Sequence, residues 1–274
     1  MRSADASRKI SDSLFRLMGA GRRRVARARL CYERHALSTW GPRSERNAGR
    51  ILCYHSIGQR PRDVNDVSQE RFRRHLEIAL RSGFRFVPAR ELAAGNGSAR
   101  DVAITFDDGL LSVATVAAPV LSEFGIPWTL FVVAGWSEHT EPWQRDQFLG
   151  WRQLEKLAAA GADIGSHSMT HPDFSTLADE PSIVTDELGE SRRVIEARLG
   201  IRPDSFAIPY GQSRNWPAVA SGIAKELGYE TVFAQAEETR PPGTVARTFV
   251  TSFDQDRVFR ALLSGAFDRW EEWF

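Results

Sequence analysis

Short apolar runs alternate along this chain with longer segments in which apolar residues recur at helical spacing. The runs typical of buried strands lie at 51–54, 84–87, 102–106, 128–133, 162–165, 205–208, 231–234 and 246–250. The helical periodicity predicts helices over 70–82, 112–124, 151–160, 182–199 and 217–227. Strands that alternate with helices are the pattern of a parallel sheet with crossover connections. Seven or eight such units in about 220 residues predict a distorted (β/α) barrel rather than an open sheet.

A glycine follows each of the predicted helices. A glycine cap supports these boundaries, because the left-handed conformation that ends many helices carries no steric penalty for glycine. The five caps are Gly83, Gly125, Gly161, Gly200 and Gly228.

Polar residues with chemical capacity directly follow several of the predicted strands. They are His55 after the first strand, Asp107 and Asp108 after the third, His167 after the fifth and the turn Pro209-Tyr210-Gly211 after the sixth. Barrel enzymes build their active sites at the carboxyl ends of the strands, so these residues are expected to meet at one end of the barrel.

The charge distribution divides the chain near residue 49. Residues 1–50 carry 13 Lys and Arg against 4 Asp and Glu, whereas the remainder carries 23 against 31. The Arg- and Ala-rich segment 1–48 ends in a stretch rich in Gly and Pro. We therefore expect a basic extension over 1–48, helical or partly disordered, followed by one domain over 49–274.

The basic segment is compatible with anionic lipid, polyphosphate or nucleic acid, and equally with a solvated surface. We expect no nucleic-acid partner and keep contact with a membrane surface as an option. Arg16 interrupts the one short apolar stretch near the start, and no run reaches the roughly 20 apolar residues of a membrane span. These features predict a cytoplasmic location, with membrane association as an alternative; the sequence predicts no oligomeric state.

Cys31 and Cys53 are the two cysteines of the chain. Cys53 lies within an apolar run and is expected to pack as a small hydrophobic residue. Two cysteines imply no disulfide framework.

Two motifs about sixty residues apart contain ligands for a divalent metal. Thr105-Phe106-Asp107-Asp108-Gly109 offers adjacent carboxylates, and His167-Ser168-Met169-Thr170-His171 offers two imidazoles at i and i+4. Two histidines and one aspartate make a three-ligand set that leaves an open position, and the second aspartate remains free as a base. Taken singly, the first motif is also typical of a turn with an N-cap aspartate, and the second of surface histidines.

These motifs resemble those of the polysaccharide deacetylases, the NodB-homology domain of carbohydrate esterase family 4. The resemblance covers about residues 50–250 and includes a third segment, Phe206-Ala207-Ile208-Pro209-Tyr210-Gly211. It implies that Asp107 is the general base and that Asp108, His167 and His171 bind the metal, most often zinc. Cobalt or nickel suits the same ligands. The resemblance further implies that Pro209 and Tyr210 contact the substrate, with the Tyr210 N–H stabilising the oxyanion.

The third segment departs from the family pattern at Ala207, where many members carry an arginine that steadies the base. Arg247, in the last predicted strand, is the candidate substitute, and a surface arginine is the alternative reading. Family members commonly carry a catalytic histidine near the C-terminal end of the domain. In this chain no histidine follows His171, so that residue is missing. The segment Ile51-Leu52-Cys53-Tyr54-His55 resembles permuted members in which the first strand supplies it, so His55 is the expected catalytic acid; alternatively it hydrogen-bonds to the backbone. His35, His75 and His139 are assigned no role.

Three tryptophans are candidates for stacking on sugar rings: Trp136 and Trp143 in the segment 134–150, and Trp216 beyond the third motif. Packing in the core is the alternative for each. The sequence thus predicts a metal-dependent hydrolase that removes N-acetyl groups from N-acetylhexosamine residues of an acetylated glycan. An O-acetyl esterase and a carbohydrate-binding protein without catalysis are the competing hypotheses.

Overall fold

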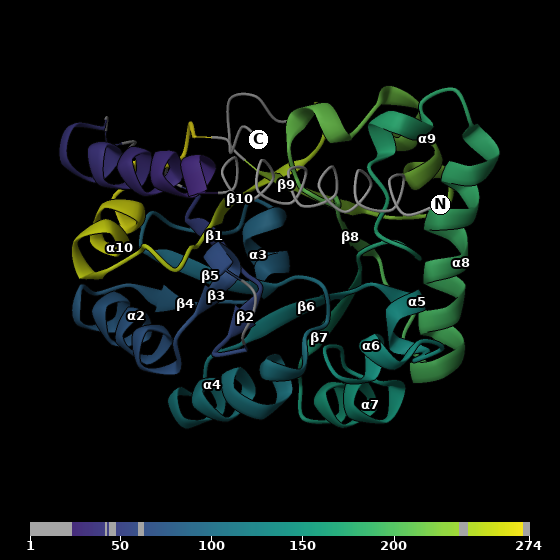
Figure 1. Cartoon of the computed structure of the whole chain (residues 1–274), viewed down its shortest axis with the longest axis horizontal. Helices are drawn as coiled ribbons and strands as arrows, with labels where there is room; N and C mark the ends of the chain where they lie inside the picture. Colours follow the sequence, from purple (N-terminus) through teal and green to yellow (C-terminus); the bar gives the residue numbers. More distant parts are fainter. Residues whose placement is uncertain (1–23, 42, 44–47, 60–62, 236–240, 271–274) are drawn as a thin grey trace, which may run out of the picture.

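Seven parallel strands form a closed barrel at the centre of the molecule (Figure 1). The computed structural model describes residues 24–41, 43, 48–59, 63–235 and 241–270. The barrel strands are β1 (Arg50–Tyr54), β5 (Asp101–Phe106), β6 (Trp128–Val132), β7 (Asp163–Ser166), β8 (Ser205–Ala207), β9 (Thr231–Gln235) and β10 (Val245–Phe249). Because β1 pairs with both β10 and β5, the ring closes, which confirms the predicted (β/α) barrel.

Three further short strands lie outside the ring. The predicted strand 84–87 is present as β4 (Arg85–Phe86) and pairs with the first residues of β5. The pair β2 (Ser56–Ile57) and β3 (Asp66–Val67) forms a small second sheet directly after His55, and the apolar pattern did not predict it.

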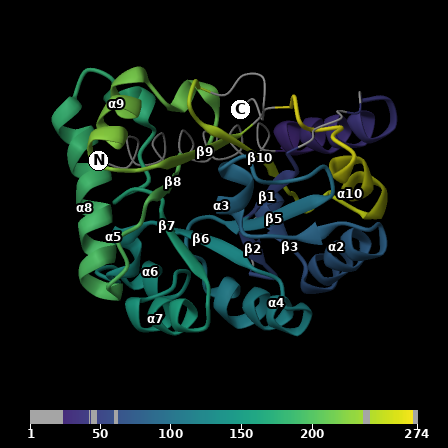
Figure 2. The ribbon, with the colours of Figure 1, turned by 180° about the vertical axis from the view of Figure 1, so that it is seen from behind.

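Helices surround the barrel (Figures 1 and 2). They are α2 (Gln69–Arg81), α3 (Ala89–Ala93), η2 (Val113–Ala117) leading into α4 (Ala118–Phe124), α5 (Ala134–Ser137), α6 (Pro142–Arg145), α7 (Trp151–Ala159), α8 (Pro181–Leu199), α9 (Ala218–Glu226) and α10 (Asp256–Leu263), with the 3-10 turns η1 (Asp63–Asn65), η3 (Phe174–Leu177) and η4 (Ser213–Asn215). The five predicted helices are all present, and all five predicted glycine caps have positive φ. Helices α3, α5, α6 and α10 were not predicted.

Side-chain alternation along the strands decides what faces the barrel interior. On β1, Leu52 and Tyr54 pack in the core layer beneath the helices, whereas Ile51 packs inside the barrel. Cys53 and His55 therefore lie on the inward side, nearer the carboxyl end. The same alternation on β5 places Ala103 in the interior and brings Asp107 to the inward side just beyond the strand.

Residues 24–40 form a helix that packs beside the barrel, against residues near α10. Its contacts centre on Arg34, which is fully buried and paired with Asp254. The Arg34 guanidinium also lies over the rings of Phe267 and Trp270, at 4.0 and 5.1 Å. The division at residue 49 stays a prediction, and residues 1–23 of the predicted extension lie outside the described residues. Within the described part of the chain, no helix combines the length and apolarity needed to cross a membrane.

Candidate active site

A cavity of about 610 Å³ opens at the carboxyl ends of the barrel strands. It collects the three sequence motifs together with residues from β1, β9, β10 and helix 24–40. Its lining includes Arg27, Cys53, His55, Asp107, Asp108, His167, His171, Tyr210, Gln235 and Arg247. The strand ends thus meet as the sequence predicted.

The three predicted metal ligands converge on one point. One donor atom from each of Asp108, His167 and His171 lies within 4.8 Å of the others. Asp108 Oδ1 stands 3.6 Å from the Nε2 atoms of both histidines. This oxygen is buried and has no hydrogen-bond partner among the described residues, which is costly unless a cation binds there. Two nitrogens and one oxygen fit a divalent ion such as zinc.

The orientation of His167 suits metal binding. Its Nδ1–H donates to the carbonyl oxygen of Ala207 at 2.7 Å, which leaves the lone pair of Nε2 directed toward Asp108. Burial lowers the pKa of His167 to about 4, so the ring is neutral at neutral pH. A neutral imidazole is the form that ligates a metal.

The motif loops are held in an unusual backbone conformation. Five non-glycine residues of the described chain have positive φ, and four of them belong to the three motifs: Asp108, Ser168, His171 and Tyr210. Such conformations are costly and persist where the surroundings enforce them. Glu187 of α8 does so for the second motif, because its carboxylate accepts hydrogen bonds from the backbone N–H groups of Met169 and Thr170. Glu187 was not predicted as a functional residue; its one distinguishing feature is an acidic side chain on the buried face of a helix.

Asp107 and Arg247 form a buried, bidentate ion pair. Arg247 donates from Nη1 to Oδ1 at 2.6 Å and from Nη2 to Oδ2 at 2.7 Å. The structure therefore brings Arg247 to the position expected of a substitute for the missing third-motif arginine. Burial alone would raise the pKa of Asp107, but Arg247 and His167 outweigh it and hold that pKa well below its usual range. Asp107 is ionised at any working pH.

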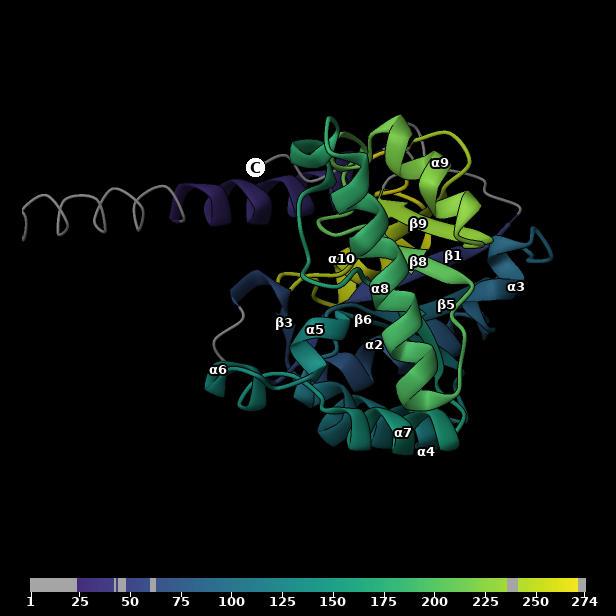
Figure 3. The same cartoon turned by 90° about the vertical axis from the view of Figure 1, so that its right-hand side faces the viewer.

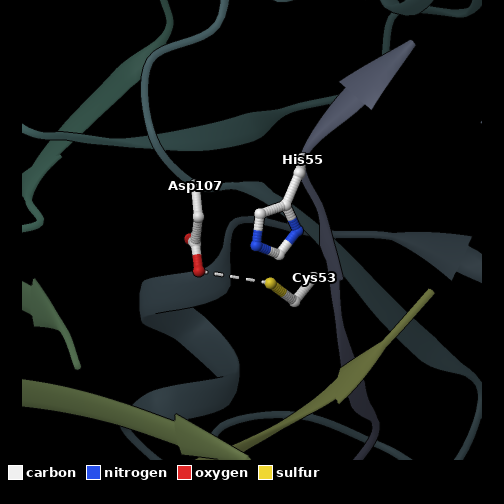
Figure 4. Close-up of side chains that lie close together, drawn as sticks. All are labelled: Cys53, His55 and Asp107. Atoms are coloured by element: carbon white, nitrogen blue, oxygen red, sulfur yellow. Dashed lines mark hydrogen bonds between the residues drawn. The ribbon is translucent and has the colours of Figure 1, made fainter. Parts of the chain in front are cut away.

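Cys53 and His55 lie beside Asp107 (Figure 4), and the three residues bring one donor atom each within 4.8 Å of one another. Burial raises the pKa of the Cys53 thiol well above its usual value, so the S–H stays protonated and donates to Asp107 Oδ2 at 3.3 Å. Cys53 is buried as predicted, but it also contacts the expected base. The buried Nδ1 of His55 has no hydrogen-bond partner among the described residues, and its ring meets the Phe249 ring edge-on at 5.4 Å.

The three tryptophans occupy different environments. Trp136 stacks on His171 with ring centroids 5.3 Å apart, and Trp143 meets Trp136 edge-on at 6.1 Å and is 45% exposed. Trp216 is buried between Phe174 and Phe206. The expectation that Trp216 lies at the rim is therefore corrected. Its ring packs with those of Phe174 and Phe206 in the core beneath α9, and it is not among the residues that line the cavity.

The remaining described histidines have structural contacts. His75 stacks on Phe259 and His139 donates from Nε2 to the carbonyl of Phe148. His35 contacts Cys31 within helix 24–40. These contacts agree with assigning them no catalytic role.

Comparison with known proteins decides the family. The polysaccharide deacetylase model matches residues 94–232, just over half of the chain. The chain belongs to the polysaccharide deacetylase family. The matched segment contains Asp107, Asp108, His167, His171 and Tyr210, whereas His55 and Arg247 lie outside it.

Curated relatives of this family member match over limited lengths. "Putative polysaccharide deacetylase YxkH" of Bacillus subtilis (strain 168) is 26% identical over 202 residues, covering 72% of this chain and 66% of the relative. A chitooligosaccharide deacetylase of Bradyrhizobium sp. (strain ANU 289) is 32% identical over 114 residues, covering 41% of this chain and 47% of the relative. The chain thus spans at most about two thirds of these two relatives.

Solved structures share the barrel. The deacetylase PplD of Streptococcus pyogenes, in complex with acetate, superposes with a TM-score of 0.66 at 21% identity, covering 78% of this chain and 96% of the other. IcaB from Ammonifex degensii superposes with a TM-score of 0.67 at 24% identity, covering 81% and 97%. At these identities the likeness establishes the fold of this chain alone.

Proposed function

We propose that this deacetylase hydrolyses the N-acetyl groups of N-acetylhexosamine residues in an acetylated glycan, with a divalent metal held by Asp108, His167 and His171. The single observation that carries the proposal is the position of Asp107. Its Oδ2 lies 3.9 Å from Nε2 of His167, one of the metal ligands, and a carboxylate oxygen also lies within 4.8 Å of a ring nitrogen of His55. Base, acid and metal ligands therefore surround one space.

The chemistry of a metal ion supports this use of the site. When bound to these three ligands, a zinc, cobalt or nickel ion supplies Lewis acidity, which makes water more acidic and an acetyl carbonyl more electrophilic. The protein's own contribution is the orientation of the ligands. Ala207 fixes the tautomer of His167, and Glu187 fixes the loop that carries His171.

Asp107 is the proposed general base. It accepts a proton from the attacking water, and Arg247 keeps its carboxylate in one orientation through two hydrogen bonds. The lowered pKa of Asp107 keeps its carboxylate ionised, which is the form that accepts a proton.

The backbone at Tyr210 is the proposed oxyanion donor. The turn is fixed against β9, because Ile208 N–H donates to Phe233 O at 3.0 Å and Gln235 N–H donates to Gly211 O at 2.6 Å. A fixed N–H stabilises developing negative charge without reorganising during the reaction. The Tyr210 ring is 55% exposed and lies 4.8 Å from the His171 ring, where it lines the cavity.

His55 is the proposed general acid. An amine leaves only after it is protonated, and an imidazole carries such a proton near neutral pH. Trp136 and Trp143 are proposed to contact sugar rings beside His171. Pro209, buried next to Tyr210, is proposed to shape the same side of the cavity.

Acetate release from three substrate classes tests the proposal. We expect turnover of N-acetylglucosamine oligomers that chelator abolishes and added zinc restores, with Asp107→Asn inactive although folded and metal-loaded. Turnover of acetylated xylan or an aryl acetate, without turnover of the oligomers, would instead identify an O-acetyl esterase. Sugar binding with no acetate released from any substrate by the metal-loaded protein would identify a carbohydrate-binding protein.

A further inference from the structure

The outer face of helix 24–40 combines exposed aromatic side chains with positive charge. Val25, Tyr32 and Trp40 are 70%, 71% and 79% exposed. Their spacings of seven and eight residues place them on one side of the helix. Arg24 and Arg29, in the first half of the helix, are also exposed, and Arg29 pairs with Glu33.

The fold does not depend on this outer face. Leu30, Arg34 and Ser38 follow each other at intervals of four residues on the inner face and are all buried. The buried pair between Arg34 and Asp254 anchors the helix to the segment before α10. The exposed rings are therefore available for another contact, and their substitution should leave the domain folded.

The inner face of the same helix reaches the catalytic cavity. Ala26 and Arg27 line it, and the Arg27 guanidinium lies 5.4 Å from the centre of the Phe253 ring. Figure 3 shows the helix extending beyond the barrel on the side where β3, α5 and α6 also lie. A surface that contacted the outer face would thus lie beside the mouth of the cavity.

The charge distribution of the chain indicates which kind of partner surface would contact the outer face of the helix. Residues 1–50 carry 13 basic against 4 acidic residues, and residues 51–274 carry 23 against 31. An anionic surface attracts the basic segment and repels the acidic body, which orients the protein with this helix toward it. Tyr and Trp favour the headgroup region of a bilayer, and a basic helix with an aromatic face is typical of proteins that lie on membranes.

We propose that the outer face of helix 24–40 docks on an anionic lipid bilayer and presents the cavity to acetylated glycans that are anchored in that membrane. The claim about the substrate rests on the proposed function. The claim about docking does not.

Vesicle sedimentation with the full chain tests the docking. We expect the protein to sediment with phosphatidylcholine vesicles that contain phosphatidylglycerol, less so at high salt, and not with phosphatidylcholine alone. Tyr32→Ser with Trp40→Ser, and separately Arg24→Gln with Arg29→Gln, should each weaken binding about tenfold.

Two double variants away from the helix serve as matched controls. Leu80→Ser with Ile183→Ser replaces apolar residues that are also exposed. Arg81→Gln with Arg193→Gln replaces arginines that pair with Glu77 and Glu190, as Arg29 does with Glu33. Both controls should bind as the parent does.

Several outcomes would overturn the docking. They are no sedimentation of the parent, equal binding to uncharged vesicles, or unchanged binding by both helix variants, which would assign the contact to another segment. A concentration-dependent dimer lost in the Tyr32/Trp40 variant, without lipid binding, would show that a second copy covers the face.

An activity comparison separates this proposal from the proposed function. The helix variants should keep the parent's rate on soluble acetylated oligosaccharides and lose its advantage on the same oligosaccharide tethered to vesicles. If the parent docks but releases no acetate from either form, the proposed function fails while the docking stands. If it docks and shows no advantage on the tethered form, the claim about the substrate fails.

Discussion

Arg247 and Asp107 form a buried two-point ion pair although they lie 140 residues apart in the chain. Their strands, β10 and β5, do not pair with each other, because β1 lies between them. The guanidinium crosses the interior beside Phe131 and Phe233, at 5.2 and 5.9 Å from the ring centres. Those rings share the interior with Ala207. A small residue at position 207 is therefore consistent with an arginine supplied from β10.

Replacing Arg247 tests what the two-point contact contributes. Arg247→Lys keeps the charge but not the planar pair of donors, so we expect kcat to fall about 10- to 100-fold with a small change in KM. Arg247→Met leaves Asp107 buried and unpaired and should cost about 3 kcal/mol of the free energy of unfolding. Steady-state kinetics and urea unfolding give the two measurements.

A double variant provides the control for Arg247. Asp107→Asn combined with Arg247→Met removes both charges, so it should recover much of the stability that Arg247→Met loses while remaining inactive. If Arg247→Met were as active as the parent, Arg247 would have no part in orienting the base.

Removing a metal ligand should separate metal binding from folding. In His171→Gln and Asp108→Asn we expect bound zinc to fall from one equivalent to a small fraction, because two ligands remain of a three-ligand set. Zinc should raise the melting temperature of the parent, since binding to the folded state stabilises it, and should leave these variants unchanged. Elemental analysis and thermal unfolding with and without chelator check both points. His139→Gln, on a histidine outside the site, is the matched control.

His55 should matter according to the leaving group. For His55→Gln we expect a fall in kcat of about 100-fold or more on an N-acetyl sugar. The fall on an aryl acetate should be far smaller, because a phenolate leaves without protonation. Equal losses on both substrates would point to a general effect on the site, and no loss on the amide would remove His55 from the mechanism.

The sequence predicted the barrel because its signals are local. Alternating strands and helices, with glycine after each helix, depend on neighbours in the chain. The short pair β2 and β3 gave no such signal, because two-residue strands have no measurable period. Helix α10 was also missed; its apolar run at 261–263 packs on the helix side of the barrel next to α2, and only the closed ring makes that position evident.

The site was predictable to the extent that its residues follow strand ends. Asp108, His167 and His171 come from two short motifs, each of which directly follows a predicted strand, so their convergence could be expected. The contact of Cys53 with Asp107 could not, because it depends on the register between β1 and β5, in which Cys53 lies opposite Thr105. Arg27 lines the cavity through the packing of helix 24–40, which no pattern in 1–50 discloses.

Two tryptophans should respond in opposite ways to truncation. Trp143→Ala removes a half-exposed ring next to Trp136, so we expect a several-fold rise in KM for a glycan and little change in stability. Trp216→Ala opens a cavity between Phe174 and Phe206 and should cost about 3 to 5 kcal/mol of stability. Kinetics and denaturant unfolding on both variants make the comparison. A higher KM for Trp216→Ala with unchanged stability would restore Trp216 to the rim.

His75 should make the stability of the protein depend on pH outside the active site. The ring donates from Nε2 to the carbonyl of Asp254 at 2.6 Å and accepts from the Tyr54 hydroxyl at 3.0 Å, and burial lowers its pKa to about 4 from 6.5. Between these values the unfolded chain binds a proton that the folded chain does not. The free energy of unfolding therefore falls as the pH drops from 6.5 to 4, by up to about 3 kcal/mol.

The variant His75→Phe tests this pH dependence. It keeps a ring against Phe259 but leaves the Tyr54 hydroxyl and the Asp254 carbonyl unpaired, so it should lose about 1 to 3 kcal/mol of stability at pH 7. Because the variant no longer takes up this proton, its deficit relative to the parent should shrink as the pH falls to 4, with His167 contributing equally to both. Urea unfolding of the two proteins in chelator at several pH values measures this, and a deficit that does not change with pH would show that His75 titrates normally.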